Sequence, residues 1–165
     1  MQQQWLAWLS APAWDSILAE AIAKEPLETG GVLLGYWAKS TEVVVTRAVG
    51  PGRDAVHRKT SFVPDHAFHV AEIAAHYDRT AGIEVYLGDW HTHPGATSGV
   101  PSAKDRSAVK RIAADPEARA PQALTMIVAG EACRWEPNLW VGCVEPLFAR
   151  WTRLRLSPCM VRHYG

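Results

Sequence analysis

Two histidines separated by a single residue lie in the middle of the chain, at His91 and His93 in the stretch HTHPGATSGVPSAKD (91–105). In a β-strand, residues two apart point to the same side, so both imidazoles can face one point while Thr92 faces away. Two neutral imidazoles suit zinc, and a catalytic zinc takes three protein ligands and keeps a fourth position open. The spacing therefore predicts a metal site that still needs a third ligand.

Asp105 is the candidate for that third ligand. Ser102 is a good N-cap, which places Asp105 in the first turn of a helix, and the loop before it lets this helix end return to face the histidines. Each part also has an ordinary interpretation, as polar residues at a strand end and as a capping box. The combination His-x-His-Pro-x7-Ser-x-x-Asp should arise by chance in roughly one chain in 10^5, which favours the metal site.

A hydrolytic metal site also requires a proton acceptor, and Glu28 in ETGGVLLG (28–35) is a candidate. Glu28 stands at the start of a hydrophobic strand, where a carboxylate at a buried edge could face the metal. Gly30 and Gly31 permit close approach of another backbone. On local sequence alone, however, a surface glutamate in a loop is the simpler interpretation of Glu28.

The elements that must position these residues are a mixture of strands and helices. Strand-like segments cover residues 5–9, 31–38, 42–49, 83–90, 123–130, 139–144 and 149–156. Helices are predicted after the cap Ser10 to about Lys24, after the cap Asp65 to about Thr80, and from Ser102 through Ala114. This order predicts an α/β fold with a central mixed β-sheet flanked by helices.

The predicted helix after Asp65 raises the question of a second metal site. Its inward-facing residues are predicted to include Phe68, Ile73 and Ala74. It also carries three histidines, at His66, His69 and His76. Residues three apart share a helix face, but no carboxylate or cysteine completes this set, so a solvated helix face is the preferred interpretation.

The composition of the 165 residues is that of a globular protein, with 48% hydrophobic residues and a formal net charge of zero. A single domain over residues 1–165 is expected, and no overall field recruits nucleic acid or a membrane. The three cysteines are odd in number and follow no metal or disulfide spacing; they are Cys133, Cys143 and Cys159. With no apparent signal peptide or membrane span, these features predict a cytoplasmic protein.

The last twenty residues contain arginines but no acid. The arginines are Arg150, Arg153, Arg155 and Arg162. A solvated edge strand is preferred here over a binding patch. Trp90, just before the histidines, has two equal interpretations, as a core aromatic or as a wall of the site entrance.

Glu28, His91-Thr92-His93-Pro94 and Ser102-x-x-Asp105 together resemble the complete JAMM motif of the JAB/MPN metallopeptidases. The resemblance implies a fold like that of cytidine deaminases and a single zinc held by His91, His93 and Asp105. It implies that Glu28 is the general acid/base and that Ser102 donates a hydrogen bond to the oxyanion. No covalent intermediate is then required.

A wider resemblance covers about Glu28 to Trp140 and includes ETGGVLLGYW, KTSFVPDH, YLGDWHTHPG and PEARAPQAL. These segments are similar to a bacterial JAB subfamily found in antiphage islands, which includes the deconjugating peptidase of CBASS operons. The resemblance implies an isopeptidase that cuts after the C-terminus of a partner protein, a cGAS-like nucleotidyltransferase joined to its target. The loop 95–100 and nearby strand edges are candidates for receiving that tail by strand addition.

Three alternatives remain to be compared with this interpretation. A peptidase that processes a ubiquitin-like or sulfur-carrier protein would use the same site. A non-catalytic MPN scaffold would bind partners only, but such scaffolds lose ligands that this chain keeps. A nucleobase deaminase requires His-x-Glu and Pro-Cys-x-x-Cys, whereas His93 occupies the glutamate position and Met160-Val161-Arg162 follows Pro158-Cys159. The deaminase is therefore rejected.

Overall fold

The computed structural model describes residues 4–132, 134–148 and 151–165. Cys133, Arg150 and the first two residues of the predicted strand 149–156 lie outside them. The strands are β1 (Trp5–Ser10), β2 (Gly30–Lys39), β3 (Glu42–Val49), β4 (Val56–His57), β5 (Phe62–Val63), β6 (Val85–Pro94), β7 (Gln122–Glu131), β8 (Arg134–Pro146) and β9 (Thr152–Tyr164). The helices are α1 (Ala11–Lys24), α2 (His66–Arg79) and α3 (Ala103–Ala114). All three predicted helices are confirmed.

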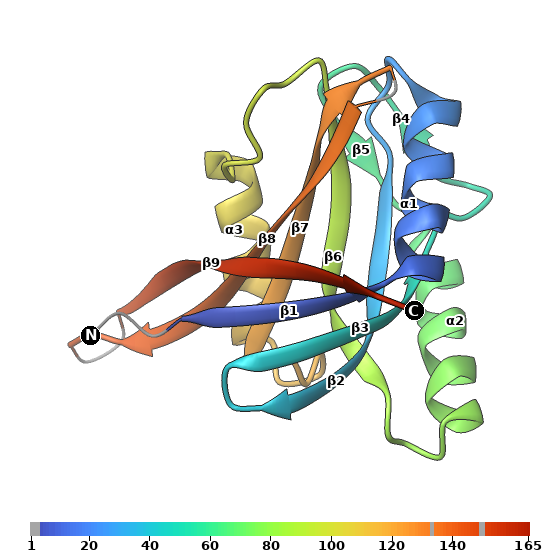
Figure 1. Cartoon of the computed structure of the whole chain (residues 1–165). Coiled ribbons are helices and arrows are strands. Elements are labelled where there is room, and N and C mark those ends of the chain that lie inside the picture. The colour runs from blue at the N-terminus through green and yellow to red at the C-terminus, as the bar shows by residue number, and fades with distance from the viewer. Residues whose placement is uncertain (1–3, 133, 149–150) are drawn as a thin grey trace.

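Seven strands form one mixed sheet, as predicted, but this sheet closes into a barrel in the order β1-β3-β2-β6-β7-β8-β9 (Figure 1). Closure is made by β9, which pairs antiparallel with β8 and parallel with β1. The described part of the arginine-containing C-terminal segment is solvated as predicted, since Arg153 and Arg155 are exposed. It is not a free edge of an open sheet, however, because Thr152–Pro158 pair with β8 and Cys159–Tyr164 pair with β1. Closure leaves fewer unpaired backbone groups than an open sheet would.

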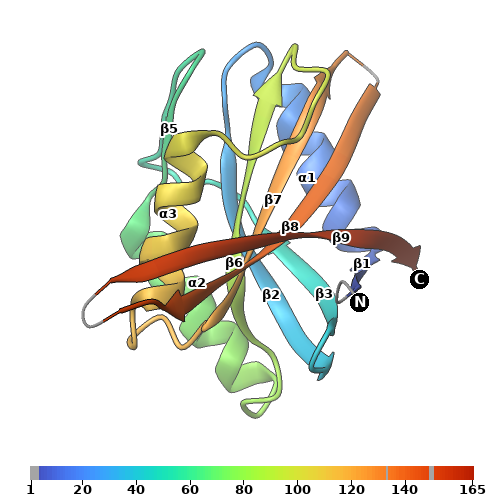
Figure 2. The ribbon, with the colours of Figure 1, turned by 90° about the vertical axis from the view of Figure 1, so that its left-hand side faces the viewer.

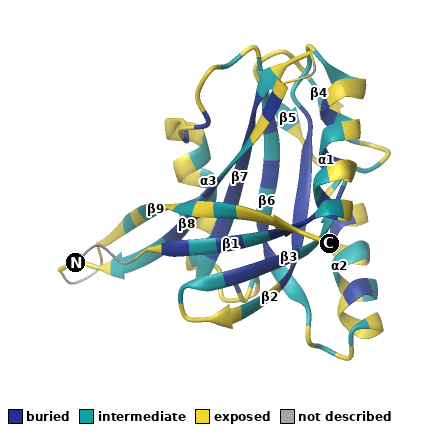
Figure 3. Cartoon of the chain, viewed as in Figure 1, coloured by how far each residue is buried: buried dark blue, intermediate teal, exposed yellow. Residues whose placement is uncertain are grey.

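The helices lie on opposite sides of the sheet, with α3 on the near side and α1 on the far side in Figure 2. Helix α1 packs Ala13, Ile17 and Ala21 into the main core. Helix α3 packs against β7 and β8, where a side chain on Gly142 would collide with Val109. The central strands are buried along most of their length while the outer helix faces are exposed (Figure 3). The close approach of Val109 to Gly142 allows α3 to pack directly on β8.

Helix α2 differs from its sequence prediction in the residues that it buries. Phe68 and Ala74 are exposed, and the buried residues are His69 and His76. Each histidine has a polar partner: His69 Nε2 lies 2.8 Å from the Gly50 carbonyl oxygen, and His76 Nε2 lies 2.6 Å from Glu84 Oε2. The interpretation of a solvated histidine face is therefore wrong, because His69 and His76 are buried and these hydrogen-bond partners replace the lost contacts with water.

The Glu84 carboxylate joins α2 to the sheet and should make stability depend on pH. Burial raises its pKa, but hydrogen bonds from Thr46 and His76 outweigh burial and lower the pKa below its ordinary value of 4.5. A carboxyl group with a lowered folded-state pKa stabilises the fold above its unfolded-state pKa and loses that contribution as pH falls.

We expect Glu84→Gln to reduce the free energy of unfolding by about 1–3 kcal/mol at pH 7. The difference from the parent protein should shrink as pH falls below about 4.5, when the parent carboxyl also becomes protonated. Denaturant unfolding at both pH values measures this, with Glu117→Gln on the exposed surface as the matched control. A difference that stays constant between pH 7 and acid would contradict the prediction.

Candidate metal centre and active site

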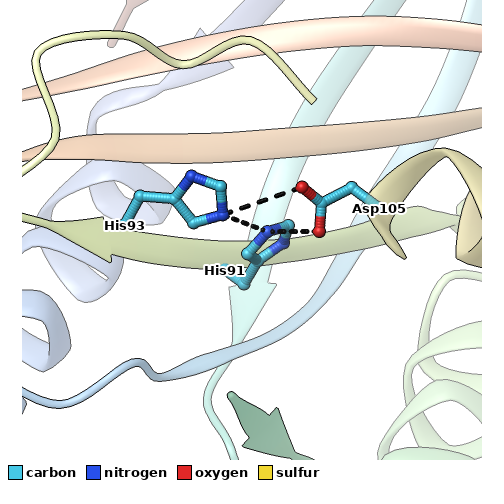
Figure 4. A group of neighbouring side chains, drawn as sticks. All are labelled: His91, His93 and Asp105. Carbon is cyan, nitrogen blue, oxygen red and sulfur yellow. Dashed lines mark hydrogen bonds and ion pairs between the residues drawn. The ribbon is translucent and has the colours of Figure 1, made fainter. Parts of the chain in front are cut away.

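Strand β6 and helix α3 bring the predicted ligands together. His91 and His93 lie on the same side of β6, and Asp105 reaches them from the first turn of α3 (Figure 4). The two Nε2 atoms are 3.0 Å apart, His91 Nε2 is 3.1 Å from Asp105 Oδ1, and His93 Nε2 is 3.7 Å from Asp105 Oδ2. Three ligand atoms converge on one point, as the spacing predicted.

These distances fit a metal of zinc's size. With ligand bonds of about 2.0–2.1 Å, a tetrahedral site places neighbouring ligand atoms about 3.3 Å apart. The observed separations lie on either side of that value. Within the part of the chain that the structure describes, this is the one group of three or more histidine, cysteine or acidic side chains with such geometry. The three histidines of α2 do not form a second one.

The protonation of the ligands also suits a cation. Burial, and secondarily the charge of His91, lowers the pKa of His93, which favours the neutral imidazole. Burial alone would raise the pKa of Asp105, but hydrogen bonds from His91 and Ser102 hold it well below its usual range. A neutral imidazole and an ionised carboxylate are the forms that bind metal.

The capping box at the start of α3 orients the carboxylate. Ser102 Oγ accepts a hydrogen bond from the Asp105 backbone N–H at 3.2 Å, and Asp105 Oδ2 accepts one from the Ser102 N–H at 2.7 Å. Asp105 is therefore part of a capping box, and the same carboxylate also lies close to both imidazoles, so the cap does not exclude the predicted ligand role. Ser102 also lines the pocket that contains Asp105.

Glu28 lines the same pocket, which has a volume of about 270 Å³ and also contains His91, His93 and Asp105. It is half-buried, so the simpler interpretation as a surface glutamate is not what the structure shows. Burial raises its pKa, although the positive charges of His91 and Lys104 oppose the shift. A carboxyl group with a raised pKa is better suited to exchange a proton near neutral pH.

Backbone contacts that the sequence analysis missed hold Glu28 in place. Two contacts join Glu28 to the β4–β5 hairpin. The Glu28 N–H donates to the Arg58 carbonyl oxygen at 2.8 Å, and His57 Nδ1 lies 3.0 Å from the Glu28 carbonyl oxygen. The next residue, Thr29, donates its N–H to Thr92 Oγ1 at 2.9 Å. Thr92, which faces away from the metal ligands, thus ties Glu28 to their strand.

Glycines make this proximity possible. A side chain on Gly30 would overlap the Trp90 carbonyl oxygen, and one on Gly31 would overlap the Val49 carbonyl oxygen. Trp90 itself is 1% exposed and donates its Nε1–H to Val49 O at 3.0 Å, so it is a core residue. Trp90 also borders the pocket that contains Glu28, from the core side.

Removing the Thr92 hydroxyl tests the link between Glu28 and β6. Thr29 and Thr92 are both fully buried, so Thr92→Val leaves the Thr29 N–H without its side-chain acceptor. We expect a loss of about 1–3 kcal/mol in the free energy of unfolding and a fall in turnover, with metal content unchanged. Unfolding, peptidase and elemental assays measure the three effects. Thr92→Ser should restore turnover; a valine variant with parental turnover would show that the link is unnecessary.

The loop predicted to receive a substrate tail is held against β8. Trp140 Nε1 donates to the Gly99 carbonyl oxygen at 2.9 Å, and a side chain on Gly99 would overlap Asn138. Together with strand ends, this loop lines a second depression that contains Gly95–Val100, Ala129–Glu131, Arg134, Glu136, Asn138 and Trp140. No helix in the described part of the chain has both the length and the apolar character needed to cross a bilayer.

Comparisons with known proteins agree with this geometry. A model of the prokaryotic homologues of the JAB domain matches residues 10–147. A probable metalloprotease of Sinorhizobium fredii is 37% identical over 137 residues, which cover 83% of this chain and 84% of the relative. A CD-NTase/cGAS isopeptidase of Vibrio cholerae is 28% identical over 72% of this chain and 68% of the relative.

A second isopeptidase with the same name, from Escherichia coli, is 34% identical over 41% of this chain and 42% of the relative. The solution structure of a Desulfitobacterium hafniense protein superposes with a TM-score of 0.66 and 18% identity, covering 96% of this chain and 94% of that one. At that identity the structural match supports the fold alone.

Proposed function

The chain belongs to the family of prokaryotic homologues of the JAB domain, and we propose that it is a zinc-dependent peptidase that hydrolyses the bond after the C-terminus of a partner protein. One observation carries this proposal: two imidazoles and a carboxylate converge within 4.8 Å of one another in a pocket that also contains Glu28 and Ser102. Relatives named as a metalloprotease and as isopeptidases support the reaction class.

His91, His93 and Asp105 are the residues that would hold the zinc. Their two nitrogens and one carboxylate match the ligand types of hydrolytic zinc sites. When bound, zinc polarises the scissile carbonyl group and favours ionisation of an attacking water near neutral pH.

Glu28 carries the proton in this scheme. Its carboxylate accepts a proton as the oxygen of water bonds to the carbonyl carbon, and it returns that proton to the nitrogen as the C–N bond breaks. The products are a new carboxylic acid on the partner's tail, which releases its remaining proton to solvent, and a free amine. The Ser102 hydroxyl, which lines the same pocket, donates to the oxyanion that develops on the carbonyl oxygen.

Covalent catalysis by a thiol is disfavoured for the two described cysteines. Burial raises the pKa of the Cys159 thiol to about 12 and also raises that of Cys143. The nucleophilic form is the thiolate, which such pKa values suppress at neutral pH. Neither cysteine lines the pocket that contains Glu28. The supported chemistry is direct attack by water.

The finer proposal concerns the partner. Isopeptidases named for CD-NTase/cGAS are among the relatives, and we infer that this enzyme likewise releases a cGAS-like nucleotidyltransferase from its conjugates in CBASS antiphage defence. The leaving amine is then the side-chain amine of a lysine or the N-terminus of the attached protein. The same site could instead process a ubiquitin-like or sulfur-carrier tail, so the partner must be tested directly.

The test uses reporter proteins fused after different tails. One fusion carries the C-terminal residues of a cGAS-like nucleotidyltransferase, another those of ubiquitin, and a third those of a sulfur-carrier protein. We expect zinc-loaded enzyme to cut the first immediately after the last tail residue, and mass spectrometry locates the bond. Efficient cutting of the other two fusions with the first left intact would contradict the antiphage assignment while retaining the zinc peptidase.

A further inference from the structure

The pocket of the active site continues past the metal ligands to a carboxylate that the mechanism does not use. Asp89 lies two residues before His91 on β6, so its side chain points to the same side of the sheet. It lines the pocket together with Thr125, its register partner on β7. The step from His91 to Asp89 is about 6.6 Å along the strand.

One half of this carboxylate is free to bind a ligand. Asp89 Oδ1 accepts a hydrogen bond from the Tyr86 hydroxyl at 2.7 Å. Among the described residues, no hydrogen bond reaches Oδ2, and the only fully enclosed side-chain atom without a partner is Trp5 Nε1. Oδ2 is therefore not fully enclosed, and because Asp89 lines the pocket, this oxygen can accept a hydrogen bond from a molecule bound there.

Among the described residues, no side-chain cation forms an ion pair with Asp89. The groups that face it are His91 from its own strand, His69 from α2 and Arg111 from α3. His69 Nε2 is already directed at the Gly50 carbonyl oxygen, and Arg111 is exposed. Within the described chain, neither approaches the Asp89 carboxylate to ion-pair distance. A largely enclosed carboxylate without a cation favours a ligand that brings one.

The strand register indicates which part of the substrate passes Asp89. Strand β2 pairs Gly30 with His91 and Val32 with Asp89, so Glu28 lies toward the opposite end of β6 from Asp89. In the proposed mechanism Glu28 protonates the leaving amine, so the leaving side extends toward Glu28. The acyl side, which is the tail of the partner, then extends toward Asp89.

We propose that Asp89 is a specificity-determining residue that selects an arginine or lysine side chain two to four residues before the scissile bond. An extended tail advances about 3.3 Å per residue, which brings this part of the tail over Asp89. The guanidinium or ammonium group donates to Asp89 Oδ2, and Thr125 offers a second polar contact at the same level. This inference rests on the proposed peptidase function.

The test scans a basic residue along an otherwise constant tail. Arginine, alanine or glutamate is placed at each of the last five tail positions and at the first three positions after the bond. For the parent enzyme, arginine at one position between the second and fourth before the bond should raise kcat/KM about tenfold over alanine and further over glutamate. The readout is the arginine-to-alanine ratio, because damage to the fold or metal site lowers both rates alike.

Asp89→Asn, which is nearly isosteric, should bring that ratio to within about threefold of unity. Glu117→Gln, which is exposed and outside the pocket, is the matched charge control and should keep the ratio. Binding is measured independently by fluorescence anisotropy of labelled tails on Glu28→Gln protein, with and without Asp89→Asn, and should show the same loss of preference.

A ratio that survives Asp89→Asn, a preference only after the scissile bond, or no preference at any position would overturn the inference. If Asp89→Asn lost zinc while the arginine-to-alanine ratio of kcat/KM stayed unchanged, Asp89 would help to hold the metal ligand His91 in place and would not select the substrate. If the zinc-loaded parent cuts no tail at all, the proposed function fails, whereas loss of preference alone leaves that function standing.

Discussion

Glu28→Gln should leave the enzyme folded and able to bind zinc but reduce turnover by at least about 10²-fold. Glutamine keeps the shape of the side chain and removes its capacity to take up and return the proton, and a positioned general acid/base contributes about this much. Glu28 binds through its backbone to the β4–β5 hairpin, and those contacts persist in the variant. The fold should therefore be preserved.

The measurement is kcat on a tail fusion, accompanied by zinc analysis and thermal unfolding of the same preparation. Glu117→Gln, exposed and outside the pocket, is the control for loss of a carboxylate and should have parental kcat. Near-parental turnover by folded, zinc-loaded Glu28→Gln would remove Glu28 from the mechanism. If the parent protein showed no more cleavage than this variant, the result would favour the alternative of a non-catalytic scaffold.

Asp105→Ala should lose both the metal and the activity. The parent protein should carry about one zinc per chain, and removal of one of three protein ligands should reduce the zinc content close to zero after dialysis. The substitution also removes half of a capping box, which costs about 1 kcal/mol of stability. Elemental analysis and a cleavage assay measure the two main effects.

Asp65→Ala provides the matched control for the lost cap. Asp65 caps α2 by accepting a hydrogen bond from the Phe68 N–H at 3.0 Å, but it does not line the pocket. It should lose similar stability and retain zinc and turnover. If Asp105→Ala held zinc as the parent does, Asp105 would be a cap alone and the ligand set would be wrong.

The parts of the site that were predictable follow from local rules. The two-residue period of a strand places His91 and His93 on one side, and the capping geometry of Ser102 places Asp105 in the first helical turn. Neither rule needs knowledge of the rest of the chain. The three helices were predictable for the same reason, since caps and apolar spacing mark them within a few residues.

The contacts that place Glu28 were not predictable in this way. Thr29 meets Thr92 across 63 residues, and nothing in the local pattern of either residue specifies the other. The β4 and β5 strands have two residues each, too few to show a period. Glu28 was therefore preferred as a site residue through the resemblance to a family motif, and the hairpin that forms hydrogen bonds with it was not predicted.

Barrel closure and the buried histidines of α2 share this non-local origin. An arginine-containing strand with no acids resembles a solvated edge, and its arginines are exposed, but only the pairing of its last residues with β1, at the other end of the chain, closes the barrel. His69 and His76 resemble surface residues until the Gly50 carbonyl oxygen and Glu84 provide partners. Polar residues in a core are determined by their partners more than by their own type.

Cleavage of a tail fusion in water enriched in oxygen-18 tests most directly whether this site hydrolyses a peptide or isopeptide bond by attack of water. We expect one heavy oxygen in the new carboxylate of the tail, no covalent adduct on the enzyme, loss of cleavage after exhaustive chelation and recovery with added zinc. Cleavage that continues at full rate in the chelated protein, or an acylated enzyme trapped by intact-mass spectrometry, would contradict the assignment of His91, His93, Asp105 and Glu28.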